Sequence, residues 1–218
     1  MNERQPLGGG NAMISVGLLM LACLVAITLF GTLIAPYNPS ETSADSLAGP
    51  TAAHWLGTDS IGRDLLSRLI VGGRTTLLIT FVAVTLAVCG GLALGLFCGY
   101  VGGLADQVVM RILDVVFAFP VFLLAIAVVA ALGPSVPNLI LTIAIVYTPR
   151  LARVVRGPVL SVKRWDHVEA ARSVGVSEFN IATRHVLPLI VSPVLVETSL
   201  TLAQTIFTVT ALSLLGLG

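Results

Sequence analysis

The sequence has few charged residues and only one lysine. Asp, Glu, Lys and Arg make up 11% of its 218 residues, whereas a soluble globular domain carries about 25%. Hydrophobic residues make up 56%, and the mean hydropathy is +0.98. This scarcity of charge argues against a water-solvated fold and predicts a chain largely surrounded by membrane lipid. The net charge of +1 gives no indication of a nucleic-acid partner, and none is expected.

Motifs for binding or catalysis inside the chain are also lacking. The single lysine, Lys163, is not part of a Gly-x-x-x-x-Gly-Lys-Ser/Thr sequence, which is the motif that holds ATP phosphates in a P-loop. The cysteines lie in apolar runs, match no metal or disulfide spacing and are interpreted as small buried residues: Cys23, Cys89 and Cys98. The histidines lie outside the apolar runs: His54, His167 and His185. We therefore predict no metal site and no catalytic residue.

Long apolar runs take the place of the missing charge. A helix that crosses about 30 Å of hydrocarbon needs about 20 apolar residues. Charge-poor runs of at least that length cover residues 13–35, 75–105, 115–149 and 188–218. The third run is too long for one helix, and a turn signal at residues 133–138 divides it in two. The sequence therefore predicts an all-α, polytopic membrane helix bundle with five spans.

The basic residues predict how the chain is oriented. Seven of the twelve Lys and Arg residues lie between the fourth and fifth spans: Arg150, Arg153, Arg156, Lys163, Arg164, Arg172 and Arg184. Because basic loops remain in the cytoplasm, this loop, residues 150–187, and the N-terminus are predicted to be cytoplasmic. The chain then consists of a cytoplasmic N-terminus with the first span (1–35), an external loop with an interfacial helix (36–73), and a transmembrane core (74–218).

A polar island interrupts the apolar sequence within the basic loop. Its characteristic residues are Glu169, Ala170, Ala171, Gly175, Leu187 and Pro188. Glu169 and Arg172 can pair on a short helix, Gly175 suits its end, and Ser177 can cap the next helix. Leu187-Pro188 is expected to break that helix, and Pro188 to begin the fifth span. The residues alone leave two interpretations open: a connecting loop or a docking surface for a partner.

Residues 54–68, after the first span, predict a short interfacial helix on the outer surface. Asp59 or Ser60 is expected to cap it, with Asp64 and Arg68 paired four residues apart. This helix could close the outer end of the bundle or contact an external protein. The candidates for such a contact are Asp59, Arg63 and Asp64.

Two acidic residues lie near or inside the apolar spans. An ionised acid at the bilayer centre costs roughly 2.5–3.5 kcal/mol, so Asp114 and Glu197 should each have a partner or water. Asp114 is predicted to pair with Arg111, one turn before it. Glu197 has no basic neighbour in the sequence, so a place in the substrate pathway and a bond to another helix both remain open.

Two further features concern helix geometry. Pro120 is expected to kink the third span, because proline removes a backbone hydrogen bond. Small residues recur every four positions in the second span: Ala87, Gly91, Gly95 and Gly99. This spacing predicts close packing against another helix rather than a substrate groove.

Four ordered segments resemble one family. Residues 169–188, with Glu-Ala-Ala, a glycine and Leu-Pro, resemble the EAA loop of bacterial ABC-importer permeases. His185 stands where the general pattern has an aliphatic residue and resembles the dipeptide/oligopeptide/nickel branch. Residues 54–68, 106–120 and 211–218 are similar to further segments of that branch. The last segment is followed in the family by another helix, so the natural protein is expected to continue and to have six spans.

The resemblance implies a type I ABC-importer permease that moves di- or oligopeptides across the bacterial inner membrane. The EAA loop is implied to be a coupling helix that docks on an ATPase through Glu169, Ala170, Ala171, Gly175, Leu187 and Pro188. The implied partners are a second homologous permease, two P-loop ATPases that bind ATP and Mg, and an external substrate-binding protein. The chain itself would need no cofactor. The alternatives are a permease for nickel or another solute, a proton-coupled secondary transporter using Asp114 and Glu197, and a scaffold subunit.

Overall fold

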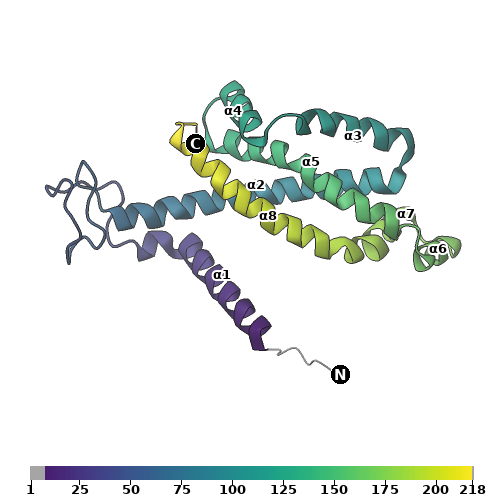
Figure 1. Cartoon of the computed structure of the whole chain (residues 1–218), viewed down its shortest axis with the longest axis horizontal. Helices are drawn as coiled ribbons and strands as arrows, with labels where there is room; N and C mark the ends of the chain where they lie inside the picture. The colour runs from purple at the N-terminus through teal and green to yellow at the C-terminus, as the bar shows by residue number, and fades with distance from the viewer. Residues whose placement is uncertain (1–7, 218) are drawn as a thin grey trace. The chain divides into compact units, whose positions relative to one another are not determined.

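The computed structural model describes residues 8–217, so the predicted cytoplasmic segment at residues 1–7 lies outside the described residues. The chain divides into two compact units, Met1–Leu78 and Ile79–Gly218. Among the described residues every regular element is a helix, apart from an isolated bridge between Thr58 and Asp64 (Figure 1). The predicted all-α class is confirmed.

The first unit contains α1 (Gly8–Ile34) and the first part of α2 (Leu65–Val101). Large hydrophobic side chains of α1 are exposed from Met13 onward, which is typical of a helix that faces lipid. Near the end of α1, the Thr28 carbonyl oxygen accepts a hydrogen bond from Arg74 Nε of α2 at 2.9 Å. This bond ties the end of α1 to the first part of α2.

The prediction of an interfacial helix over residues 54–68 is wrong, because residues 54–64 form turns rather than a helix. Asp59 accepts hydrogen bonds from the backbone N–H groups of Ile61 and Arg63, and such local bonds favour turns over helix. The helix begins only at Leu65, where Asp64 Oδ2 accepts from the Ser67 N–H at 2.8 Å and caps α2.

The second unit is built around α5 (Val136–Val162). Its other elements are the rest of α2, α3 (Gly103–Phe117), α4 (Val121–Leu132), α6 (Asp166–Ser173), α7 (Glu178–Asn180), the π-helix η1 (Ile181–Val186) and α8 (Leu187–Leu214). α5 packs against α3, α4 and α8 (Figure 1). The turn predicted between the third and fourth spans is confirmed, because Ser135 Oγ accepts from the Asn138 N–H and caps α5.

Glycines bring α2 close to α5. A Cβ atom on Gly95 would lie 2.5 Å from Val155 Cβ and 2.6 Å from the Ala152 carbonyl oxygen. Gly91 and Gly99 meet α5 in the same way. Packing within the chain, as predicted, is therefore the role of the small residues at this spacing.

Pro120 marks a break rather than a kink. α3 ends at Phe117, Pro120 stands directly before α4, and the two helices are bent by 90°. Four helices of the described chain are long and apolar enough to cross a membrane, and the bent α3–α4 pair is a candidate fifth span. If α3 and α4 together are counted as one span, the described chain has the five spans that were predicted.

The predicted loop at residues 150–187 begins too early. α5 continues through Pro149 and ends at Val162. A proline removes one backbone hydrogen bond, but burial of the next turns, including Leu151, Ala152 and Val155, stabilises the helix beyond it. Three arginines assigned to a loop therefore lie on a helix.

The cysteines also differ from the prediction. Cys98 is buried on α2, but Cys23 and Cys89 are exposed. A thiol behaves as a small hydrophobic group, so it can face either lipid or protein. Apolar neighbours in the sequence therefore do not show whether a cysteine is buried within the protein.

Candidate functional site

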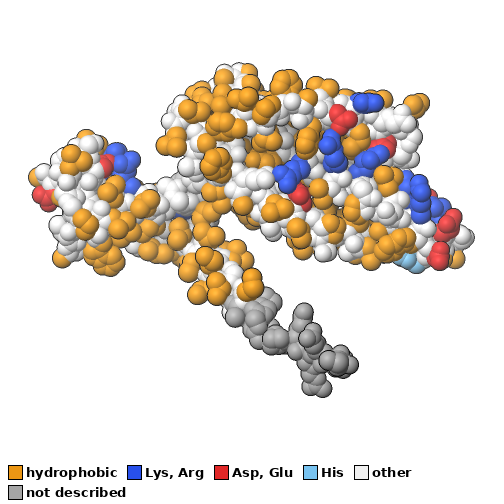
Figure 2. Space-filling view, viewed as in Figure 1, with side chains coloured by type: hydrophobic (Ala, Val, Ile, Leu, Met, Phe, Trp, Pro, Cys, Tyr) orange, Lys and Arg blue, Asp and Glu red, His pale blue; other side chains and the backbone are white. Residues whose placement is uncertain are grey.

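Residues 163–186, between α5 and α8, form what we call the polar segment. On the face shown in Figure 2, charged side chains of the second unit gather toward the end that carries α6, and hydrophobic side chains cover most of the remainder. The docking surface that we predicted from the sequence lies in this polar segment and at the start of α8.

A hydrophobic core holds the polar segment in place. Val168 and Ala171 of α6 are buried with Ile181 and Val186 of η1. The same core includes Val159 of α5 and further residues of α5 and α8. The segment is therefore packed against the membrane helices by side chains on one of its faces.

Gly175 ends α6 as predicted. Its φ is +81°, a conformation that glycine adopts without steric cost. The Gly175 N–H donates to the Arg172 carbonyl at 3.0 Å, and the Val176 N–H donates to the Ala171 carbonyl at 3.1 Å. This pair of bonds is the Schellman motif, and it fixes the direction in which the chain leaves α6.

The second half of the segment differs in part from the prediction. Ser177 Oγ accepts from the Asn180 N–H, as expected of a cap, and Pro188 lies in the first turn of α8. Leu187-Pro188 does not break the helix, because η1 passes into α8 with helical backbone angles at both Val186 and Leu187.

Hydrogen bonds join the segment to α2, and the ion pair within the segment differs from the predicted one. Arg172 does not pair with Glu169; its Nε donates to Glu178 Oε1 at 3.0 Å, and Tyr100 donates its hydroxyl to the other Glu178 oxygen. Lys163 Nζ donates to the Gly99 carbonyl at 2.6 Å and to the Tyr100 carbonyl at 3.2 Å. A cation there also complements the negative end of the α2 dipole.

The predicted docking residues fall into two groups. Glu169, Ala170, Gly175 and Pro188 are exposed, whereas Ala171 is buried and Leu187 half-buried. Three exposed hydrophobic residues in the same segment were not predicted: Trp165, Val174 and Phe179. Val174 and Phe179 are 79% and 77% exposed, so this surface is partly apolar.

Three arginines on α5 form a row of ion pairs that we call the arginine ladder. Arg150 pairs with Glu197 of α8. Arg153 Nη2 lies 2.5 Å from Asp114 Oδ1. Arg156 binds both oxygens of Asp106 at 2.6 Å, with Nε and Nη2. Glu197, which has no basic neighbour in the sequence, thus meets another helix.

The ladder corrects two predictions. Asp114 pairs with Arg153 rather than Arg111, and the Arg153 guanidinium also lies 4.3 Å from the centre of the Phe117 ring. Asp106 was missed, although it is 6% exposed and fully paired. The available signal was the spacing of three arginines at every third position, which aligns them on one helix face.

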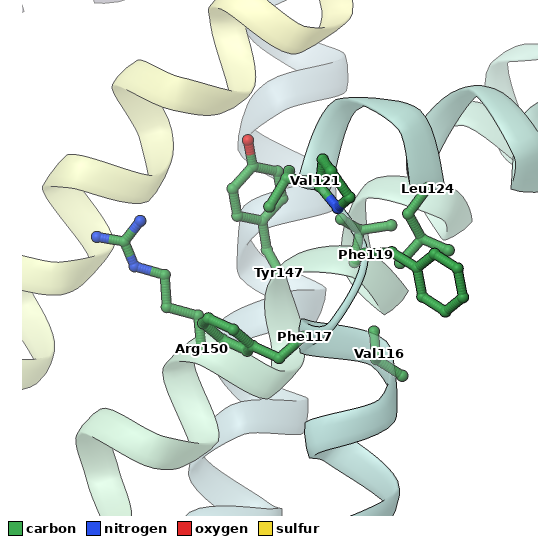
Figure 3. Close-up of a pocket in the computed structure, with 9 residues that line it drawn as sticks. Val116, Phe117, Phe119, Val121, Leu124, Tyr147 and Arg150 are labelled. Carbon is green, nitrogen blue, oxygen red and sulfur yellow. The ribbon is translucent and has the colours of Figure 1, made fainter.

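A cavity of about 210 Å³ lies at the α3–α4 break. Phe117 and Phe119 line it from the break, and Tyr147 and Arg150 from α5 (Figure 3). Figure 3 shows the Arg150 guanidinium extending toward α8. A cavity with mostly apolar walls and one cation is suited to a ligand that has both apolar and anionic groups.

The external candidates Asp59, Arg63 and Asp64 are engaged within the first unit. Asp59 pairs with Arg63 at 2.8 Å and with Arg68. Asp64 is 3% exposed and pairs with His54 at 3.0 Å rather than with Arg68 as predicted. Desolvation raises the pKa of Asp59, but hydrogen bonds from Arg63 and Ile61 and the Arg63 charge outweigh it and hold the pKa well below its usual range.

This shift predicts that the stability of the loop before α2 depends on pH. Because the folded pKa of Asp59 lies below the unfolded one, its stabilisation is present above about pH 4 and is lost as the pH falls through the folded value. In a Trp165→Phe background, Trp55 fluorescence should report a transition below that pH. Asp59→Asn should show the acid-state signal already at neutral pH. Identical titrations for the two proteins would contradict the role of Asp59.

Comparison with known proteins agrees with these features. Residues 91–218 match the family described as "Binding-protein-dependent transport system inner membrane component". The chain belongs to this family. It is the permease component of a binding-protein-dependent ABC transporter, an inner-membrane multi-pass protein that is not itself catalytic. Membership implies an ATPase and a binding protein as partners.

The permease is similar to proteins of the peptide/nickel branch. It is 42% identical to the glutathione transport system permease protein GsiD of Pectobacterium atrosepticum, over 94% of this chain and 68% of the relative. It is 40% identical to the dipeptide transport system permease protein DppC of Alkalihalophilus pseudofirmus, over 95% and 69%. GsiD of Escherichia coli O157:H7 is 42% identical over 92% and 67%. The resemblance noted in the sequence is confirmed.

Proposed function

We propose that this permease imports short peptides and that its polar segment docks on a cytoplasmic ATPase. The seven basic residues at positions 150–184 support the orientation, because basic loops remain in the cytoplasm. The same rule supports a cytoplasmic N-terminus and an external loop before α2.

The observation that carries the docking proposal is the two-sided character of the polar segment. Its inner face is fixed by Val168, Ile181 and Val186. Its exposed side chains include Glu169 and the hydrophobic residues Val174 and Phe179. Exposed apolar residues rimmed by charge mark protein-binding surfaces.

The attachment of the segment also suggests how it transmits movement. The shared core and the bonds from Lys163 connect it to α2, α5 and α8. Closure of the ATPases on ATP binding would displace α6, and these contacts would pass the displacement to the membrane helices. The pathway would then open toward the external binding protein, which releases its peptide.

Co-purification with the transporter's P-loop ATPases tests the docking proposal. Glu169→Lys and Val174→Asp should reduce the recovered ATPase about tenfold, because each places a mismatched charge in the interface. The matched control is Glu41→Lys, the same change at an exposed residue of the loop before α2, and it should leave recovery unchanged. Equal recovery from all four proteins would remove the docking role.

The proposed substrate class follows from the relatives, whose names specify glutathione and dipeptide transport. Uptake of L-alanyl-L-alanine and of glutathione into proteoliposomes would separate these two. Nickel uptake without peptide uptake would overturn the proposal. The proton-coupled alternative has no support in the geometry, because Asp114 and Glu197 are each paired with an arginine.

A further inference from the structure

Arg150 lies where two hollows of the second unit meet. One is the cavity of about 210 Å³ at the α3–α4 break. The other, of about 540 Å³, lies between α4, α5 and α8 and includes Ala203, Gln204 and Phe207. Val121, Tyr147 and Arg150 line both. Among the described residues, Arg150 is the only charged one that lines either of the two hollows.

The guanidinium of Arg150 retains donors for a ligand. Its Nε pairs with Glu197, and its Nη1 donates to Gln204 Oε1 at 2.9 Å. Its Nη2 has no partner among the contacts of the described residues, and the side chain is 35% exposed. Arg156 differs, because Asp106 takes its Nε and Nη2 with both oxygens.

We propose that Arg150 binds a carboxylate of the transported solute. Arginine pairs strongly with carboxylates because its planar N–H groups match their two oxygens. The aromatic and aliphatic walls lower the local dielectric constant and strengthen that attraction, while they accept apolar side chains of the solute. This inference rests on the proposed function, in which the solute is a peptide with a free C-terminal carboxylate.

Protection of a single cysteine tests the site directly. Ala203 is exposed and lines the larger hollow, so Ala203→Cys, with the three native cysteines replaced by alanine, can be labelled with a maleimide in the full transporter. The probes are L-alanyl-L-alanine and its C-terminal amide. The free acid should slow labelling at roughly tenfold lower concentration than the amide, the expected effect of one charge-assisted hydrogen bond.

Removing Arg150 alone would leave Glu197 buried without a partner, so the variants are made in a Glu197→Gln background. Glu197→Gln alone keeps the guanidinium and should keep the preference for the free acid. Adding Arg150→Gln should abolish that preference. Arg153→Gln, the matched control three residues along α5, should retain it, because Arg153 lines neither hollow.

Each outcome decides the proposal. An unchanged preference for the free acid without Arg150 would overturn it. So would equal protection by acid and amide in the unsubstituted protein. Slower labelling that depends on phosphatidylglycerol in the vesicles, rather than on the peptide, would assign Arg150 to lipid headgroups instead. Uptake of the dipeptide tests the proposed function separately, since the protection assay can be read even where uptake is absent.

Discussion

Gly95→Leu is expected to prevent the second unit from packing correctly. The new Cβ would lie 2.5 Å from Val155 Cβ and 2.6 Å from the Ala152 carbonyl oxygen. Neither atom is at the end of a flexible side chain, so α2 and α5 would have to separate. Overpacking of this kind costs about 1–3 kcal/mol or more. Thermal unfolding of the purified permease should show a marked loss of stability, with little protein recovered from membranes.

Gly157→Ala is the control for this change. A Cβ on Gly157 of α5 would meet nothing within 4 Å, and alanine favours a helix by up to about 1 kcal/mol over glycine. This variant should be as stable as the unsubstituted protein or slightly more so. If both variants unfold at the same temperature, the close approach of α2 and α5 is not what Gly95 provides.

Arg156→Ala is expected to cost about 3–5 kcal/mol, because it leaves the Asp106 carboxylate buried without a partner. The same assay on Arg153→Ala should show less than about 1 kcal/mol, since Arg153 and Asp114 are 46% and 48% exposed. Arg156→Met with Asp106→Leu removes both charges and should restore most of the stability. Equal losses at Arg153 and Arg156 would show that burial does not govern the strength of these pairs.

Hydropathy and local signals predicted much of the fold. Apolar length located the spans, Gly175 the end of α6, and residues 133–138 the turn before α5. These features depend on backbone preferences and on the length of membrane that a helix must cross. They are determined by short stretches of sequence, so one chain is enough to identify them.

Charge pairing was predicted poorly for a common reason. Three ion pairs were predicted between residues three or four positions apart in the sequence. In each of them, the acidic or the basic residue pairs instead with a different residue. Asp114 binds Arg153, Arg172 binds Glu178, and Arg68 binds Asp59. A surface pair within one helix contributes only about 0.2–0.5 kcal/mol, so tertiary packing decides which partner is used. Asp106 and Glu197 depend entirely on that packing.

The π-helix has a consequence for the phase of α8. In an α-helix each residue advances the side-chain direction by about 100°, so buried positions recur every three or four residues. That rhythm holds along α8 at Ile190, Val194 and Glu197, but the step from Ile181 to Val186 is five. One surplus residue in η1 thus resets the rotation of α8. Without it, Ile181 in the core of the polar segment and the face of α8 that brings Glu197 to Arg150 would point in different directions.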